Sequence, residues 1–141
     1  MTEKETQSII EIGIERLLPE VDALRSAGWR IIQILCISSP EGNELSYSFG
    51  LGMEMRSLRL RVLAASAAEG PAAETEVPSI TALYPAAFLN ENEIRDLFGV
   101  HIERIAGDWD GKVYDVVGAP GGGKPFSKVT VRATSSEEAP R

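Results

Sequence analysis

The sequence of 141 residues has one cysteine, Cys36, and one histidine, His101. One cysteine cannot form a disulfide within the chain, and it cannot build a four-thiolate iron–sulfur cluster or a structural zinc site. Cys36 also lies in an apolar run without a histidine or a cation beside it, which is typical of a core residue rather than a nucleophile. Any redox cofactor is therefore expected in a partner chain.

Long apolar runs are absent too. The hydrophobic fraction is 43%, but no uninterrupted apolar stretch approaches the roughly 20 residues of a membrane-spanning helix. The opening MTEKETQSII carries charges of both signs and lacks the apolar core and cleavage site of a secretory signal. We expect a protein that stays in the cytoplasm or faces it.

Basic charge is scarce, with 14 Lys plus Arg against 21 Asp plus Glu and a net charge of -7. Such a chain repels phosphate backbones and anionic lipid surfaces. The composition therefore argues against a nucleic-acid partner, and against direct binding to a membrane.

Hydrophobic periodicity predicts an α+β fold in which a small mixed or antiparallel sheet of about three to four strands packs with two or three helices. Residues 8–12 suit a short strand. The pattern over residues 14–27 predicts a helix that ends at Gly28, with Pro19 as a point of kinking or of a late start.

The run WRIIQILCI, residues 29–37, is apolar and β-branched almost throughout, which predicts a central strand buried on both faces. Residues 45–52 and 55–65 alternate apolar with polar side chains, so we expect two further strands in an antiparallel meander. The same alternation places three basic residues on a solvated strand face: Arg56, Arg59 and Arg61.

Composition divides the chain into two parts. Residues 1–105 hold the periodic segments and are expected to form the folded domain. Residues 106–141 are rich in glycine and in short alternating pieces, so we expect an extended, partly disordered and flexible C-terminal segment.

A glycine-rich stretch in that segment, GAPGGGKP at residues 118–125, fits the start of the phosphate-binding template Gly-x-x-x-x-Gly-Lys. However, Pro125 stands where Ser or Thr would bind magnesium, and the following SKVTVRA alternates like a strand instead of opening a helix. A nucleotide-dependent enzyme is therefore a minor alternative. No catalytic residue and no small-molecule substrate are expected.

The densest pattern is NENEIRDLFGV, residues 90–100. On a helix Glu93 and Asp96 share a face, and Gly99 supplies a left-handed C-terminal cap. Asn90 is a candidate N-cap with Glu93 as its capping-box partner, and Glu91 can pair with Arg95. The acidic residues have three possible roles: a metal or acid–base site, a solvated helical face, or an interface with a partner's arginines and amides.

Two linked motifs carry a family resemblance. The pattern Glu-x-Glu-x-x-Asp-x-Phe-Gly-Val resembles the signature of the thirty-kilodalton subunit of respiratory complex I and its membrane-hydrogenase relatives. The upstream run Pro-Ser-x-Thr-x-x-Tyr-Pro is similar to one that this family places about ten residues before the signature; here it consists of Pro78, Ser79, Thr81, Tyr84 and Pro85.

The resemblance implies a subunit without a catalytic centre that docks onto the large catalytic subunit and the iron–sulfur subunit of a membrane-bound complex. It implies no cofactor in this chain, with iron–sulfur clusters or a nickel–iron centre in the partner subunits, and only an indirect association with the cytoplasmic membrane. The residues expected to bind the partner are Pro78, Ser79, Tyr84, Pro85, Glu91, Glu93, Asp96, Phe98 and Gly99.

The chain departs from the respiratory branch of the family at two places. Asn92 stands where that branch usually has arginine, and the continuation after Val100 includes AGDWDG in place of a Gly-His-Pro segment. These departures are similar to the hydrogenase branch, so NADH dehydrogenase and hydrogenase types both stay open. The alternative from another class is a free-standing protein-binding or regulatory domain whose acidic helix docks a basic partner.

Overall fold

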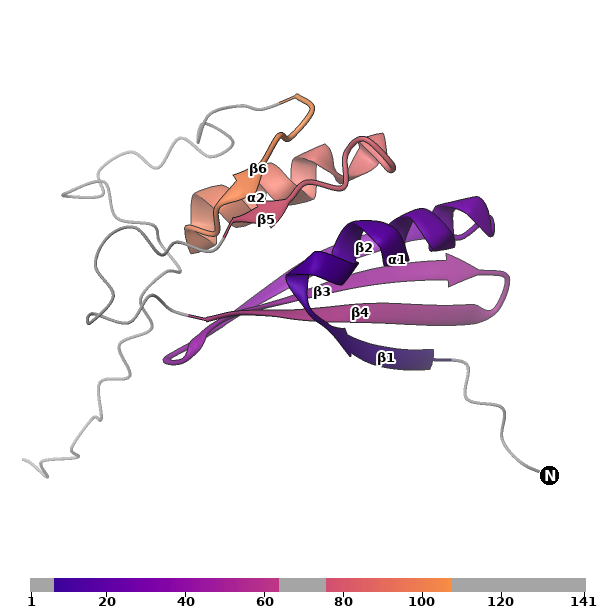
Figure 1. The fold of residues 1–141 in the computed structure, drawn as a ribbon, viewed down its shortest axis with the longest axis horizontal. Coiled ribbons are helices and arrows are strands. Elements are labelled where there is room, and N and C mark those ends of the chain that lie inside the picture. The colour runs from indigo at the N-terminus through magenta and orange to yellow at the C-terminus, as the bar shows by residue number, and fades with distance from the viewer. Residues whose placement is uncertain (1–6, 64–75, 108–141) are drawn as a thin grey trace, which may run out of the picture.

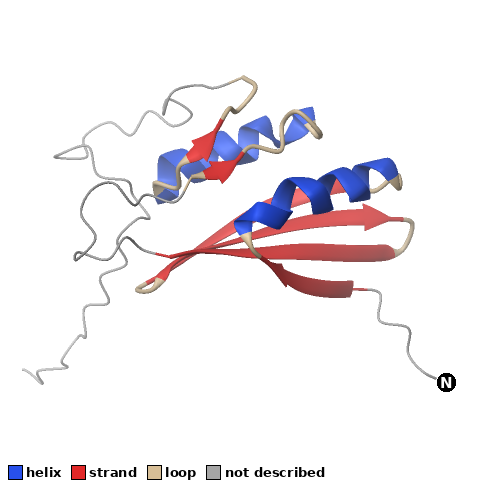
Figure 2. Ribbon diagram, in the orientation of Figure 1, coloured by secondary structure: helices blue, strands red, loops and turns tan. Residues whose placement is uncertain are grey.

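The computed structural model describes residues 7–63 and 76–107, and within them it has the predicted α+β architecture (Figures 1 and 2). The elements in chain order are β1 (Gln7–Ile12), α1 (Ile14–Ser26), β2 (Arg30–Ser39), β3 (Gly42–Leu51), β4 (Glu54–Leu63), β5 (Val77–Pro78), the 3-10 turn η1 (Pro85–Ala87), α2 (Phe88–Phe98) and β6 (Ile102–Glu103).

The main sheet is mixed and has the strand order β1-β4-β3-β2. Strands β2, β3 and β4 form the predicted antiparallel meander, and β1 pairs with β4 in parallel. Short strands β5 and β6 form a second, parallel pair. Both helices and this pair lie on one side of the main sheet (Figure 1).

Helix α1 begins after Gly13 and runs without interruption past Pro19. It ends as the sequence predicts, because Gly28 adopts the left-handed conformation with φ 86° and its amide donates to the Arg25 carbonyl at 3.1 Å. The buried residues of α1 are Leu17, Val21 and Leu24.

The core lies between the helices and one face of the sheet. β3 contributes Leu45, Tyr47 and Phe49, all at 0% exposure, and β4 contributes its alternate residues Leu58, Leu60 and Val62. At one end Arg56 lies over the Trp29 ring, 4.8 Å from its centroid, so this arginine faces the core side of the sheet. Arg59 and Arg61 lie on the other side, in ion pairs with Glu44 and Glu11.

The prediction that residues 29–37 form a central, doubly buried strand is wrong. β2 is the edge strand of the described sheet, and only alternate residues such as Ile34 and Cys36 are buried. The apolar run hid the alternation, because apolar residues also occupy the outward-facing positions. The segment expected at 106–141 lies outside the described residues after Gly107.

Candidate functional site: a clamp between two motifs

The two motifs meet where α2 packs beside β5. Helix α2 begins at Phe88, one turn earlier than an N-cap at Asn90 would allow, so that N-cap prediction is wrong. The reason is local: η1, with Pro85 at its start, already winds the chain, and its end runs into α2. At the other end Gly99 has φ 70° and donates to the Arg95 carbonyl at 3.1 Å, which confirms the predicted cap.

Glu91 joins the motifs inside the protein. Its side chain is 0% exposed. The Ile80 amide donates to Glu91 Oε1 at 2.8 Å, and the Ser79 hydroxyl donates to Oε2. Glu91 therefore bridges the first turn of α2 to the segment that follows β5, instead of lying on a solvated face of the helix.

The hydroxyls of the upstream motif extend this bridge. Ser79 Oγ and Thr81 Oγ1 are 2.7 Å apart, and the Thr81 amide donates to Ser79 Oγ at 3.1 Å. Thr81 Oγ1 in turn accepts the Ala106 amide at 2.8 Å. One polar network thus holds the segment before α2, the helix itself and the segment after it.

Asn92 makes a second link between α2 and the segment that follows it. Its side chain is buried, and Nδ2 donates to the Phe88 carbonyl at 2.7 Å and to the Gly107 carbonyl at 3.1 Å. The residue that departs from the respiratory pattern therefore ties the start of α2 to the segment that follows β6.

We call the hydrogen-bonded group of Ser79, Thr81, Glu91 and Asn92 the clamp. It is attached to the main sheet by Tyr84, whose hydroxyl donates to the Trp29 carbonyl at 2.7 Å. The Tyr84 ring also packs against Phe49, with ring centroids 5.4 Å apart. These contacts place the motif segment against the start of β2.

Burial sets the electrostatics of this region. Desolvation raises the pKa of Glu91, and the hydrogen bonds from Ser79 and Ile80 oppose that rise. The pKa of the buried Tyr47 is raised by desolvation and then by the nearby Glu91 charge. Burial also raises the pKa of Cys36 to about 12, so its thiol stays protonated at neutral pH and is a poor nucleophile.

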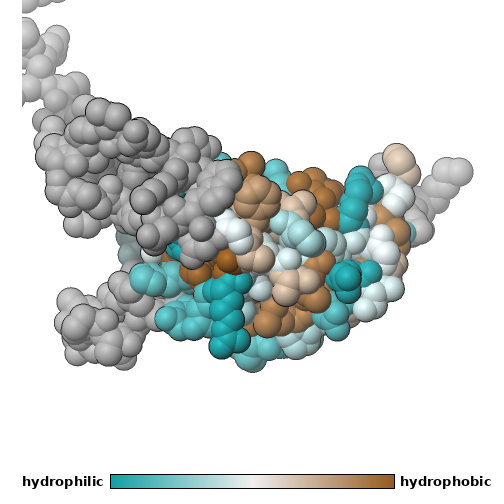
Figure 3. All heavy atoms as spheres, turned by 90° about the horizontal axis from the view of Figure 1, so that it is seen from above, coloured by the Kyte–Doolittle hydropathy of each residue, from teal (hydrophilic) through white to brown (hydrophobic). Residues whose placement is uncertain are grey.

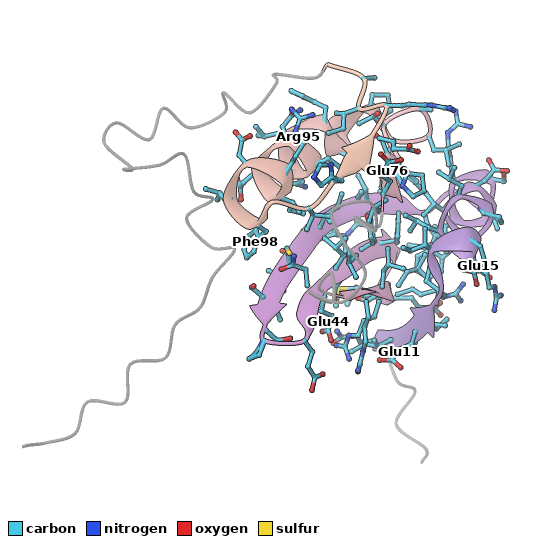
Figure 4. All side chains as sticks on the ribbon, turned by 60° about the vertical axis from the view of Figure 1, so that its left-hand side comes forward. Glu11, Glu15, Glu44, Glu76, Arg95 and Phe98 are labelled. Atoms are coloured by element: carbon cyan, nitrogen blue, oxygen red, sulfur yellow. The ribbon has the colours of Figure 1, made fainter. Side chains whose placement is uncertain are left out.

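The expected partner-binding residues divide by exposure. Ser79, Tyr84, Glu91 and Asp96 are buried in this chain, whereas Pro85 is exposed and four others are partly exposed: Pro78, Glu93, Phe98 and Gly99. Figure 4 shows Arg95 and Phe98 on α2. Partner contact by any of these residues stays a prediction, and Pro85 together with the partly exposed residues forms the available surface.

A groove of about 510 Å³ runs beside the clamp, between α1 and the β5–β6 pair. Apolar side chains such as Leu18 and Leu83 line it, with Asp22, Glu103 and Arg104 as its charged members. The helical side of the molecule mixes apolar and hydrophilic patches (Figure 3). Ser79 also lines the groove, and its hydroxyl donates to Glu91.

Two further findings apply to the described ranges, 7–63 and 76–107. No group of three or more His, Cys, Asp or Glu side chains there is arranged to hold a metal ion, so the acidic residues of α2 do not form a metal site within this part of the chain. Neither described helix has the length and apolarity of a membrane span.

Comparisons with known proteins agree with the two motifs. The family model of the respiratory-chain NADH dehydrogenase 30 Kd subunit matches residues 10–107. The fold is similar to a chain in the structure of the membrane-bound sulfane sulfur reductase (MBS), an archaeal respiratory membrane complex. The TM-score is 0.68 at 18% identity, over 83% of this chain and 68% of that one. A search of curated proteins finds no match.

The family match spans most of the chain, from Ile10 in β1 to Gly107, whose carbonyl accepts a hydrogen bond from Asn92. It includes both motifs and every element of the clamp. The chain belongs to the family of the respiratory-chain NADH dehydrogenase 30 Kd subunit.

Proposed function

We propose that this chain is a non-catalytic assembly subunit in the cytoplasmic arm of a membrane-bound electron-transfer complex, where it docks onto the large catalytic subunit. Family membership supports a role as a subunit. The similar fold in an archaeal respiratory membrane complex fits the same role. The complex is either an NADH:quinone oxidoreductase type or a ferredoxin-linked nickel–iron hydrogenase type.

The observation that carries the proposal is that two polar residues of the signature point into the protein and not into solvent. Glu91 and Asn92 are both 0% exposed and bind other segments of the same chain. A catalytic carboxylate has to reach a substrate, whereas these groups fix backbone segments against one another. The signature therefore suits a rigid docking surface better than a reaction centre.

The docking surface consists of the partly exposed motif residues on and around α2. Glu93 offers a carboxylate to a partner's arginines or amides, and Phe98 offers an apolar ring at the end of the helix. Iron–sulfur clusters or a nickel–iron centre belong to the partner subunits in this proposal, and the membrane is reached only through them.

The test is to isolate the tagged protein from its native cell in mild detergent, identify co-purifying chains by mass spectrometry and measure bound metals. We expect a large catalytic subunit, iron–sulfur proteins and membrane subunits. Glu93→Lys should reduce their recovery, while Glu15→Lys, at an exposed glutamate on α1, should not. A protein that emerges alone and free of metal would favour a free-standing binding domain instead.

A further inference from the structure

The face of the main sheet opposite the helices has two halves of different character. On the β1 and β4 half, charged side chains pair with one another: Arg61 with Glu11 at 2.9 Å, and Arg59 with Glu44 at 3.2 Å. Figure 4 shows Glu11 and Glu44 at this part of the sheet. Beside them Ser48 and Ser57 share a hydrogen bond of 2.9 Å. These polar side chains bind one another, and the exposed Ile9 of β1 lies beside them in register with Ser57.

The β2 half is apolar and exposed. Ile32, Leu35 and Ile37 are 44%, 47% and 52% exposed. Leu35 and Ile37 lie on the outward face because the register pairs them with Ser46 and Glu44, whose side chains also point away from the helices. Ile32 lies in the irregularity between Ile31 and Gln33, and its Cδ1 is beside Gly50 on the same face. A strip of three large aliphatic side chains on one strand is a typical contact surface.

The same strand has a free edge in the described sheet, since β2 is last in the order β1-β4-β3-β2. Natural edge strands are usually short, or carry lysine, proline or an inward charge that blocks further pairing. β2 is ten residues long and contains neither lysine nor proline. Its one irregularity lies between Ile31 and Gln33, so the part from Ile34 to Ser39 is regular.

Charged residues lie at the two ends of β2. Arg30 begins the strand and pairs with Gly50. Its guanidinium group lies beside Gly50 on the outward face. Glu41 is exposed in the turn just past Ser39. The stretch from Ile31 to Ser39 carries no charge. A complementary strand would be uncharged in its middle, with an acidic group near Arg30 and a basic group near Glu41.

We propose that an extended segment of a partner subunit adds to β2 as a fifth strand, with alternate apolar side chains against Ile32, Leu35 and Ile37, an acidic residue near Arg30 and a basic residue near Glu41. This inference rests on the proposed function, because it names a surface by which the subunit joins its complex. Strand addition supplies backbone hydrogen bonds, and the apolar strip and the two terminal charges supply specificity.

Amide hydrogen exchange across β2 tests the proposal, measured by mass spectrometry on the isolated chain and on the purified complex. We expect the β2 amides to exchange about tenfold more slowly, or slower still, in the complex, because an added strand would bond those that face outward. If the complex forms and β2 exchanges as fast as in the isolated chain, strand addition is refuted while the subunit role stands. If no complex forms, the proposed function itself fails.

Substitutions separate strand addition from other contacts. Ile37→Lys should lower recovery of the complex at least several-fold, whereas Met53→Lys, at a residue 89% exposed in the β3–β4 turn, should leave it unchanged. Loss of the complex with Ile37→Lys but without β2 amide protection in the parent complex would show that the face is covered without strand pairing. Protection already present in the isolated chain, with a dimer by sedimentation, would assign the edge to a second copy; both results overturn the proposal.

Discussion

The clamp around α2 and the outward face of β2 distribute polarity in opposite ways. In the clamp an acid and an amide, Glu91 and Asn92, are fully buried. On β2 the aliphatic side chains of Leu35 and Ile37 are about half exposed. Buried polar groups persist when they are fully hydrogen-bonded, and exposed apolar strips persist when they serve a contact. Glu91 and Asn92 therefore hold this subunit together, while the aliphatic side chains of β2 face outward.

Removing the Glu91 carboxylate should have the largest effect on the fold. Glu91→Ala leaves the Ile80 amide and the Ser79 hydroxyl without their acceptor and opens a small cavity, so we expect a loss of about 3 kcal/mol in the free energy of unfolding. Urea denaturation followed by circular dichroism measures it. Glu93→Ala, two residues away and partly exposed, should cost less than about 1 kcal/mol; equal losses would contradict the clamp.

The raised pKa of Glu91 predicts a specific pH dependence. Between the ordinary carboxyl value of 4.5 and the higher folded value, the folded state keeps a proton that the unfolded state has lost. The stabilising contribution is therefore complete below 4.5 and is lost as pH rises through the folded pKa. Glu91→Gln should flatten this part of the stability profile, measured by denaturation at a series of pH values, and an unchanged profile would exclude Glu91 as its source.

Detaching the clamp from the sheet should cost less. Tyr84→Phe keeps the ring packing on Phe49 and removes only the hydrogen bond to the Trp29 carbonyl, for an expected loss of about 1 kcal/mol. Tyr47→Phe is the matched control, because the buried Tyr47 hydroxyl has no hydrogen-bond partner among the described residues. Its removal should be neutral or slightly stabilising. A larger loss from Tyr47→Phe than from Tyr84→Phe would reverse this assignment.

The smallest effect on the isolated chain should come from the exposed strip. Ile37→Lys changes a side chain that is 52% exposed, so the free energy of unfolding should change by less than about 0.5 kcal/mol. Thermal or urea denaturation of the isolated protein measures it. A loss as large as that of Glu91→Ala would show that Ile37 stabilises this chain itself, and the contrast between the two regions would fail.

Local patterns predicted most of the fold. Gly28 and Gly99 marked the helix ends correctly, because only a residue that tolerates positive φ suits those caps. Alternation of apolar and polar residues predicted β3 and β4, because successive side chains of a strand point to opposite faces of the sheet. β2 was misplaced because its outward-facing residues are as apolar as its buried ones, and strand order depends on pairing that no local pattern contains.

The sequence predicted both motifs of the clamp but not the hydrogen bonds between them. Helical spacing suggests partners three or four residues from Glu91, but the actual partner Ser79 lies twelve residues upstream. One signal existed: Ser79 and Thr81 are small hydroxyl residues in an otherwise apolar stretch, which is typical of side chains that bind a buried polar group. The family resemblance marked both motifs without indicating that they bind each other.

The bond from Asn92 to the Gly107 carbonyl has a consequence for tethering. Together with the Ala106 amide held by Thr81, it fixes the position of Gly107 beside α2. A molecule that binds residues beyond Gly107 would therefore be held close to α2 at a high effective concentration, and even a weak second contact there would add avidity. Asn92→Ala would remove the bond to the Gly107 carbonyl and so release this position from α2.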